Sequence, residues 1–242
     1  MSIRFEVNGD RTTLIATVSG HLRVSGVAAL RRHLLECLAE QPEALLIDLS
    51  GLEVEQPRAL SIFTVVLRQA AKWPGTPIML CGPTPATREL MVVPVQHRLP
   101  LCDDLAAALA HLNGERQTVP SVSEDLLPVA GTTRHARDLA TEACLRWDLP
   151  GLVAPASVIV TELIGNVVDH AHTMMTLYLS LRPRYLNIAV SDGSPQPPAA
   201  PGPVPPEAAS GRGLLLVNEL ADCWGHLPSK DGKVVWAALR RP

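Results

Sequence analysis

The sequence lacks both the long apolar run that a membrane span requires and the basic cluster that a nucleic-acid ligand requires. It begins MSIRFEVNGDRTTL, with charges where a signal peptide would have its apolar core. Its longest apolar stretches, such as 152–160, fall short of the roughly 20 residues of a membrane span. The net charge is −3 and no basic run stands out, which argues against nucleic acid as the main ligand. We therefore expect a cytoplasmic protein with no membrane and no direct nucleic-acid partner.

Paired cysteines are also lacking. The sequence has five cysteines, all far apart and never in a C-x-x-C pair: Cys37, Cys81, Cys102, Cys144 and Cys223. An odd and scattered set is typical of buried thiols in a reducing compartment, and less so of a disulfide framework or a metal site.

Two polar or proline-rich segments divide the chain. Residues 113–129, NGERQTVPSVSEDLLPV, have no helical periodicity, and we predict domains at 1–114 and 129–242 joined by a linker at 115–128. Residues 194–210 contain seven prolines in seventeen positions, which excludes a helix or a central strand. This segment is either an inter-domain linker or an excursion within the second domain. We favour the excursion, because the 32 residues after position 210 could hardly fold alone.

The first half alternates apolar strand patterns with helical ones. Strands are expected at 5–7, 13–18, 44–49 and 77–81, and helices at 24–39, 58–72 and 104–112. This order predicts a sheet covered by helices on at least one face.

With LLIDLSGLE before one helix and IMLCGPTPATRELM after it, residues 3–113 resemble a STAS domain, the fold of anti-sigma-factor antagonists. In members that are phosphorylated, the resemblance implies an acid and then a serine in the loop after LSG. Here those positions hold Gln56 and Pro57, and Arg23 stands where an acid often follows the early Gly-x-Leu. Ser61 is a nearby hydroxyl one helical turn later. The family's phosphorylation switch is therefore not expected to operate, which leaves this domain as a docking or autoinhibitory module.

The second half contains an acid, an amide and an imidazole at regular spacing. A helix is expected at 132–147 and another at 155–172, and the second carries Glu162, Asn166 and His170 four residues apart. Each step of four turns about forty degrees, so we expect all three on one helix face. Taken alone, such a pattern more often decorates a solvated face.

Two further features follow this helix. A hairpin at 176–181 and 185–190 ends in Asp192-Gly193, and after the proline-rich segment Gly211-Arg212-Gly213 leads into a helix. A glycine turn at a helix N-terminus lets backbone N–H groups approach phosphate, although a single G-x-G is more often a turn.

In this order, TELIGNVVDHAH, VSDGSP, GRGLLLVNELADCWG and GKVVWAAL resemble the histidine-kinase-like ATPase fold in its anti-sigma-factor serine-kinase branch. The resemblance implies a Bergerat-type α/β sandwich with a mixed sheet, and ATP and Mg²⁺ as cofactors. It implies that Glu162 is the catalytic base, that Asn166 is the Mg²⁺ ligand and that Asp192 accepts the adenine amino group. The other cofactor-binding residues that it implies are His170, Gly193, Gly211, Arg212, Gly213 and Leu214. His170 has an alternative role on the helix surface.

The sequence departs from this family at Ser194, where a glycine is usual, and at Val234, where a threonine often begins the last strand. We read Trp224 and Trp236 as core residues that pack the lid helix on the sheet.

The predicted fold class of the chain is thus α/β (α+β), and its predicted function is the regulation of sigma-factor activity. In one reading its C-terminal domain holds Mg-ATP and binds a sigma factor or phosphorylates a separate STAS antagonist, as a serine/threonine kinase. In the alternative it is a non-catalytic ATP-binding scaffold. A homodimer remains open.

Overall fold

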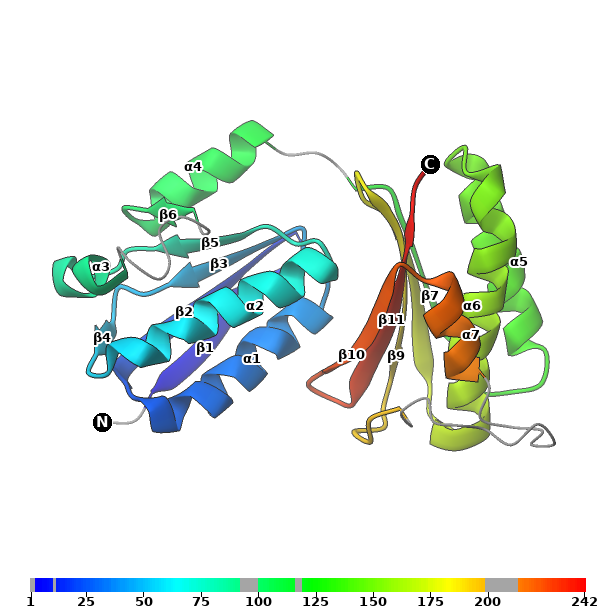
Figure 1. The fold of residues 1–242 in the computed structure, drawn as a ribbon, viewed down its shortest axis with the longest axis horizontal. Helices are drawn as coiled ribbons and strands as arrows, with labels where there is room; N and C mark the ends of the chain where they lie inside the picture. The colour runs from blue at the N-terminus through cyan, green and yellow to red at the C-terminus, as the bar shows by residue number, and fades with distance from the viewer. Residues whose placement is uncertain (1–2, 11, 92–99, 116–118, 199–212) are drawn as a thin grey trace. The chain divides into compact units, whose positions relative to one another are not determined.

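The computed structural model describes residues 3–10, 12–91, 100–115, 119–198 and 213–242 (Figure 1). The chain divides into two compact units, Met1–Thr118 and Val119–Pro242.

The N-terminal unit is built on a mixed sheet whose strand order is β1-β2-β3-β5-β6, with β4 also paired to β2. The strands are β1 (Arg4–Gly9), β2 (Thr13–Leu22), β3 (Ala44–Asp48), β4 (Leu52–Val54), β5 (Ile78–Cys81) and β6 (Leu101–Cys102). β1 and β2 form an antiparallel hairpin, and the other pairs are parallel. The strands expected from the sequence are all present, whereas the short strands β4 and β6 were not foreseen.

Helices cover both faces of this sheet. They are α1 (Val27–Ala39), α2 (Ser61–Lys72), α3 (Pro85–Met91) and α4 (Leu105–Glu115), with 3-10 turns η1 (Val24–Gly26) and η2 (Pro57–Leu60) before the first two. In Figure 1, α1 and α2 lie side by side on one face and α4 lies on the other. Ala44, Leu45, Leu46 and Ile47 of β3 are therefore buried in succession, as is typical of a parallel strand covered on both sides.

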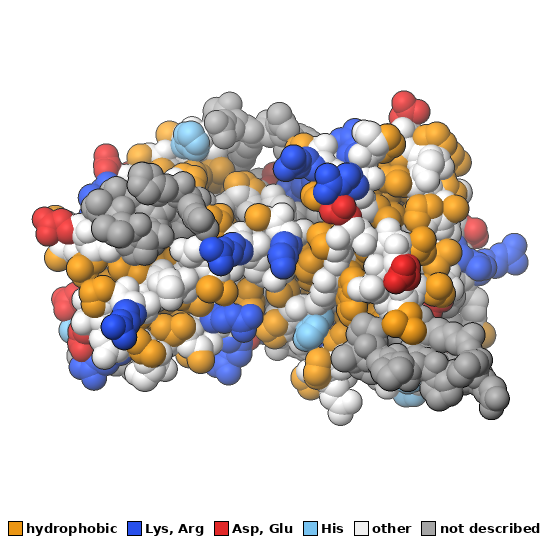
Figure 2. Space-filling model, viewed as in Figure 1, with side chains coloured by type: hydrophobic (Ala, Val, Ile, Leu, Met, Phe, Trp, Pro, Cys, Tyr) orange, Lys and Arg blue, Asp and Glu red, His pale blue; other side chains and the backbone are white. Residues whose placement is uncertain are grey.

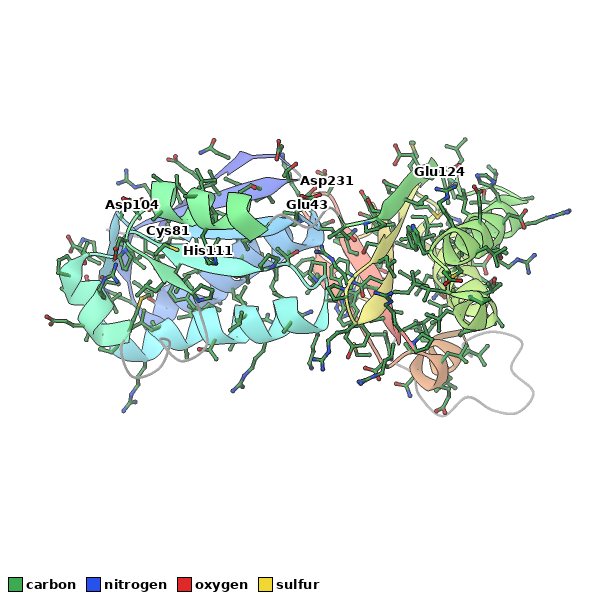
Figure 3. The ribbon with its side chains drawn as sticks, turned by 90° about the horizontal axis from the view of Figure 1, so that it is seen from above. Glu43, Cys81, Asp104, His111, Glu124 and Asp231 are labelled. Carbon is green, nitrogen blue, oxygen red and sulfur yellow. The ribbon has the colours of Figure 1, made fainter. Side chains whose placement is uncertain are left out.

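The cysteines are free thiols, and three of the five are buried. Burial is the main reason that the pKa values of Cys37 and Cys81 rise to about 12. Burial also raises the pKa of Cys144, to about 11. Figure 3 labels Cys81 on β5 and His111 on the neighbouring α4. At neutral pH these thiols are protonated, so they lack the thiolate character that reactive cysteines need.

The C-terminal unit is a five-stranded sheet in the order β10-β11-β9-β8-β7. Its strands are β7 (Ser121–Leu126), β8 (Met175–Leu181), β9 (Tyr185–Asp192), β10 (Cys223–Pro228) and β11 (Lys233–Arg240). The prediction of a mixed sheet is wrong here, because every pair among these strands is antiparallel. β8–β9 and β10–β11 are hairpins, and β9 and β11 then pair as antiparallel neighbours.

Three helices cover one face of this sheet (Figure 1). They are α5 (Thr132–Arg146), α6 (Val153–Asn166) and α7 (Gly213–Leu220), with a 3-10 turn η3 (Pro150–Leu152) before α6 and a π-helical turn η4 (Val167–Ala171) after it. The core between these layers contains Ile159 and Leu163 of α6, Ile188 of β9 and Val235 of β11.

Residues that were predicted as linker form β7 instead. Val122 and Leu126 pack on the core while Ser121, Ser123 and Asp125 are exposed, as the alternation of an edge strand requires. The polar positions face solvent, so the segment resembles a loop when read without its pairing partner. The predicted linker 115–128 is therefore too long.

The segment Pro150–Ala171 is 22 residues long, has a mean hydropathy of 1.7 and passes the length and composition test for a membrane span. The sequence reading, which found no stretch of that length, was thus too strict. Five residues of α6 are buried, and they pack in the core of the C-terminal unit: Ala156, Ile159, Val160, Leu163 and Ile164. We interpret the segment as the central helix of a globular unit.

The two tryptophans that were predicted to pack the lid helix, Trp224 and Trp236, lie on different faces of the sheet. Trp224 packs on the core and its Nε1–H donates a hydrogen bond of 3.1 Å to Asn218 Oδ1 on α7, as expected. Trp236 does not pack the lid helix. It alternates with Val235 and Ala237, which face the helices, so it lies on the other face of the sheet, opposite Gly225 and Ala189.

Candidate nucleotide-binding site

The helix that carries the predicted site residues changes its winding after Asn166. Glu162 and Asn166 lie within α6, one turn apart, and both side chains are half-buried. The next five residues form the π-helical turn η4, which ends at His172 with a φ of 53° and a bond of 2.8 Å from the His172 N–H to the Val167 carbonyl. Single π-helical turns occur frequently at functional sites.

This turn changes the winding of the chain between Asn166 and His170. The prediction that Glu162, Asn166 and His170 share a face assumed one uninterrupted α-helix. The π-helical turn alters the rotation per residue beyond Asn166, and His170 is exposed. The exposure of His170 agrees with a surface role and does not test a role at the site, so both stay predictions.

Glu162 lies against the first residue of α7. A Cβ atom placed on Gly213 would be 3.3 Å from Glu162 Cδ and closer still to Oε2. The carboxylate is thus close to the N-terminal end of α7, where helix dipoles favour negative charge. Glycine at position 213 lets the two helices approach in this way.

Of the other predicted lid residues, the structure describes only Leu214. Gly211 and Arg212 lie outside the described residues. Leu214 is buried in the core together with Val217, so only its backbone could face a ligand.

We expect the Glu162–Gly213 contact to be measurable without any ligand. Gly213→Ala should destabilise the chain relative to Gly165→Ala, a matched helical glycine with open space around its Cβ position. The deficit should shrink in a Glu162→Ala background, because the obstacle is then gone. Thermal unfolding of the four variants should give a coupling of about 0.5–3 kcal/mol. A coupling of zero would mean that the two residues do not touch.

Asp192 approaches the same end of the unit from the sheet. Leu186, Ile188 and Val190 of β9 face the helices, and Asp192 continues this alternation, as Lys233 does for β11. The two residues are direct cross-strand partners. Both therefore point to the side of the sheet that α6 and α7 cover.

Asp192 and Lys233 form a buried ion pair. Lys233 Nζ lies 2.8 Å from Asp192 Oδ1, and the two side chains are 10% and 2% exposed. The Ser194 N–H donates to the same Oδ1 at 2.8 Å, and Lys233 Nζ also donates to the Ser194 carbonyl at 3.2 Å. Burial and then the charge of Lys233 lower the pKa of His226, on neighbouring β10.

Sequence reasoning missed Lys233. It placed the family's threonine position at Val234, but the register pairs Val234 with Ser191, and Val234 points away from the helices. The residue opposite Asp192 is Lys233. The sequence does show a lysine directly before an apolar strand, which could have indicated a residue of the site. It does not show which positions of that strand face the helices.

Two close backbone approaches join the end of β9 to its neighbours. The Gly193 N–H donates to Thr173 Oγ1 at 3.0 Å, which ties this end to the residues after η4. A Cβ atom on Gly232 would lie 2.8 Å from Gly193 Cα, so no larger residue fits without a shift. The end of α6, the start of α7, the end of β9 and the start of β11 thus meet at one end of the unit.

The residues present fit a bound Mg-nucleotide. Asn166 offers a neutral amide oxygen, and no group of three His, Cys, Asp or Glu side chains converges to hold a metal among the described residues. A magnesium ion here would therefore take most of its ligands from phosphate and water, as is usual for Mg²⁺. Asp192 offers the acceptor that a purine amino group needs, and its Oδ1 atom accepts from both Lys233 Nζ and the Ser194 N–H.

An α/β sandwich with an acid and an amide on its central helix, and with a glycine at the start of the facing helix, defines a class of nucleotide-binding domain. Residues 129–239 match the model of the histidine kinase-like ATPase domain, and the C-terminal unit belongs to this family. Domains of this family typically bind ATP and Mg²⁺.

Other comparisons gave partial matches. An uncharacterized protein of Streptomyces coelicolor is 37% identical over 80 residues, which cover 31% of this chain and 76% of that protein. Among solved structures, an anti-sigma factor antagonist from Mycobacterium paratuberculosis is 26% identical, with a TM-score of 0.40 over 46% of this chain and 95% of that one. The unphosphorylated anti-sigma factor antagonist SpoIIAA is 14% identical, with a TM-score of 0.40 over 47% of this chain and 100% of its own.

Proposed function

We propose that the C-terminal unit binds Mg-ATP where α6, α7, β9 and β11 meet, and that the chain regulates sigma-factor activity through partner proteins. The observation that supports this most is the convergence of Glu162 with Gly213 on the side of the sheet to which Asp192 points. Packing alone does not require Glu162, Gly213 and Asp192 to lie on the same side of the sheet, whereas a nucleotide site does. The pairing of a STAS-like unit with this family of ATPase domain is consistent with a partner-switching regulator.

Each residue would have one task. The Asn166 amide oxygen would ligate Mg²⁺, and Asp192 would accept a hydrogen bond from the adenine amino group, which guanine lacks at that position. The N–H groups at the start of α7 would face phosphate, since an N-terminal helix end favours anions. His170 is left out of this set because it is exposed.

Glu162 is the proposed general base. Mg-ATP supplies a transferable phosphoryl group when bound. Glu162 would take the proton from a serine hydroxyl as its oxygen bonds to the γ-phosphorus and the bond from that phosphorus to the departing ADP oxygen breaks. The Glu162 side chain is only half-buried, which leaves it accessible to a partner's hydroxyl.

The proposed protein substrate is a separate STAS antagonist, with a sigma factor as the other candidate partner. The chain's own STAS-like unit has Pro57 at the acceptor position, and proline has no hydroxyl. The direct experiment is incubation of the full chain with labelled ATP, magnesium and purified STAS proteins, followed by mapping of phosphoserine. Absence of transfer to every STAS protein would leave only the binding role.

A second candidate is an ATP-binding scaffold without phosphotransfer. The closeness of the Glu162 carboxylate to the first residue of α7 favours it, because a carboxylate that stabilises the N-terminal end of a helix need not act as a base. In this role the nucleotide would set which partner is bound.

Magnesium dependence tests the binding step for both candidates. We expect Mg-ATP to raise the melting temperature of the wild-type chain, by an amount that grows once ligand exceeds its dissociation constant. Asn166→Ala should remove the difference between ATP with and without magnesium, whereas Asn8→Ala, an exposed asparagine of the other unit, should retain it. Equal magnesium dependence in both variants would exclude Asn166 as the ligand.

A further inference from the structure

The ion pair between Asp192 and Lys233 is unusual in its burial. Lysine is almost never buried unless it is paired, and here the side chain is 10% exposed. The pair lies at the end of β9 and the start of β11, next to the close approach of Gly232 to Gly193. It therefore stands at the edge of the site, where a purely packing role would be met equally well by apolar residues.

The ammonium group of Lys233 is a donor aimed at an acceptor that the proposed function assigns to adenine. Its Nζ bonds Asp192 Oδ1 directly, as an amino group of a purine would do. A charge-assisted hydrogen bond between ammonium and carboxylate is roughly twice as strong as a bond from a neutral donor. The neutral amino group of adenine therefore competes at a disadvantage.

Lys233 also fixes the backbone that follows Asp192. Its second bond goes to the Ser194 carbonyl, and the Ser194 N–H returns to Asp192 Oδ1. Carboxylate, ammonium and loop thus form one closed set of hydrogen bonds. A base that enters has to rearrange this set or share the carboxylate with it.

We propose that Lys233 is an affinity-determining residue, an intramolecular occupant of the purine-amino position that weakens ATP binding by this unit. The inference rests on the proposed function, because it assigns Asp192 to the nucleobase. It adds that the ligand-free state is held by a group of the chain itself. Nucleotide occupancy then depends on how readily Lys233 leaves Asp192.

The test compares the affinity of Mg-ATP for three forms of the full chain by isothermal titration calorimetry. Lys233→Thr replaces the ammonium with a small hydroxyl, and Lys230→Thr makes the same change at an exposed lysine of the same hairpin. We expect Lys233→Thr to bind Mg-ATP at least about tenfold tighter than wild type, in line with the loss of a charge-assisted competitor. Lys230→Thr should bind as wild type does.

The outcomes separate this inference from the function on which it rests. Wild-type binding with no gain in Lys233→Thr would overturn the role of Lys233 and leave the ATP site standing. Weaker binding in Lys233→Thr would also overturn it, since Lys233 would then be contributing to the ligand contact. No binding by any of the three forms would overturn both proposals.

A second variant covers the case in which Lys233→Thr fails to fold, because Asp192 would then be buried without its partner. Lys233→Gln keeps the stem length and a neutral donor for Oδ1 while it removes the charge. It should also bind Mg-ATP tighter than wild type, by less than Lys233→Thr does. The unliganded variant should melt at a lower temperature than wild type, which reports the loss of the ion pair without any nucleotide.

Discussion

Glu162→Gln should retain Mg-ATP binding and lower phosphotransfer to a STAS partner by roughly two to four orders of magnitude. The change keeps the size and the hydrogen-bonding reach of the side chain but removes its capacity to hold a proton. Binding should persist because Asn166 and Asp192, which the proposal assigns to metal and base, are untouched. The measurement pairs single-turnover transfer of labelled phosphate with calorimetric binding of ATP.

Glu219→Gln is the matched control, since Glu219 is an exposed acid on α7, the helix whose first residue Glu162 contacts. It should transfer phosphate at the wild-type rate. If Glu162→Gln lost binding and transfer together, Glu162 would be a ligand or a support of α7 instead of a base. If it lost neither, the carboxylate would have no part in the reaction.

Patterns of local periodicity made the secondary structure predictable. The run 44–47 is apolar without interruption and forms most of β3, and the helical spacing at 132–147 appears as α5. Amphipathic spacing carries this information because it is a direct consequence of burial on one face. β7 was lost for the opposite reason, since half of an edge strand faces water and its sequence then resembles a loop.

Strand direction and strand phase were harder to predict. The C-terminal sheet was expected to be mixed, but it is antiparallel. The sequence did not reveal the strand direction because the pairing of β9 with β11 joins segments that are far apart in the sequence. The wrong choice of Val234 came from the strand phase, that is, from which positions of β11 face the helices. In a strand that is buried on both faces, such as β11, apolar residues occupy successive positions and no alternation shows which side chains face the helices.

The candidate site divides in the same way. The spacing of Glu162 and Asn166 follows from helix geometry and was predictable. The π-helical turn that contains His170, and the lysine that pairs with Asp192, are not revealed by the spacing of residues in the sequence. For both His170 and Lys233, the sequence shows the residue type but not the residues that surround it in the fold.

Long incubation of the full chain with Mg-ATP should add no phosphate to residues 1–113. The resemblance to STAS domains places Pro57 at the acceptor position, and this residue begins the turn η2 and has no nucleophile. The preceding position, Gln56, has an extended backbone and accepts a hydrogen bond of 2.7 Å from the Val24 N–H through Oε1. The loop is thus held by an amide at the position where the resemblance to phosphorylated STAS domains implies an acid.

Two serines near this loop are the alternatives that intact-mass analysis and peptide mapping would detect. The Ser61 hydroxyl donates to the Arg58 carbonyl at 2.9 Å, so its proton is already committed within the helix start. Ser50 is exposed, and its backbone N–H bonds to Asp48 Oδ1 in the turn after β3. A phosphorylatable STAS protein in the same reaction serves as the positive control for transfer. Stoichiometric phosphate on Ser50 or Ser61, with the control also modified, would mean that the acceptor has moved along the loop. No phosphate on either, with the control modified, would mean that this unit's partner contacts are independent of its own phosphorylation.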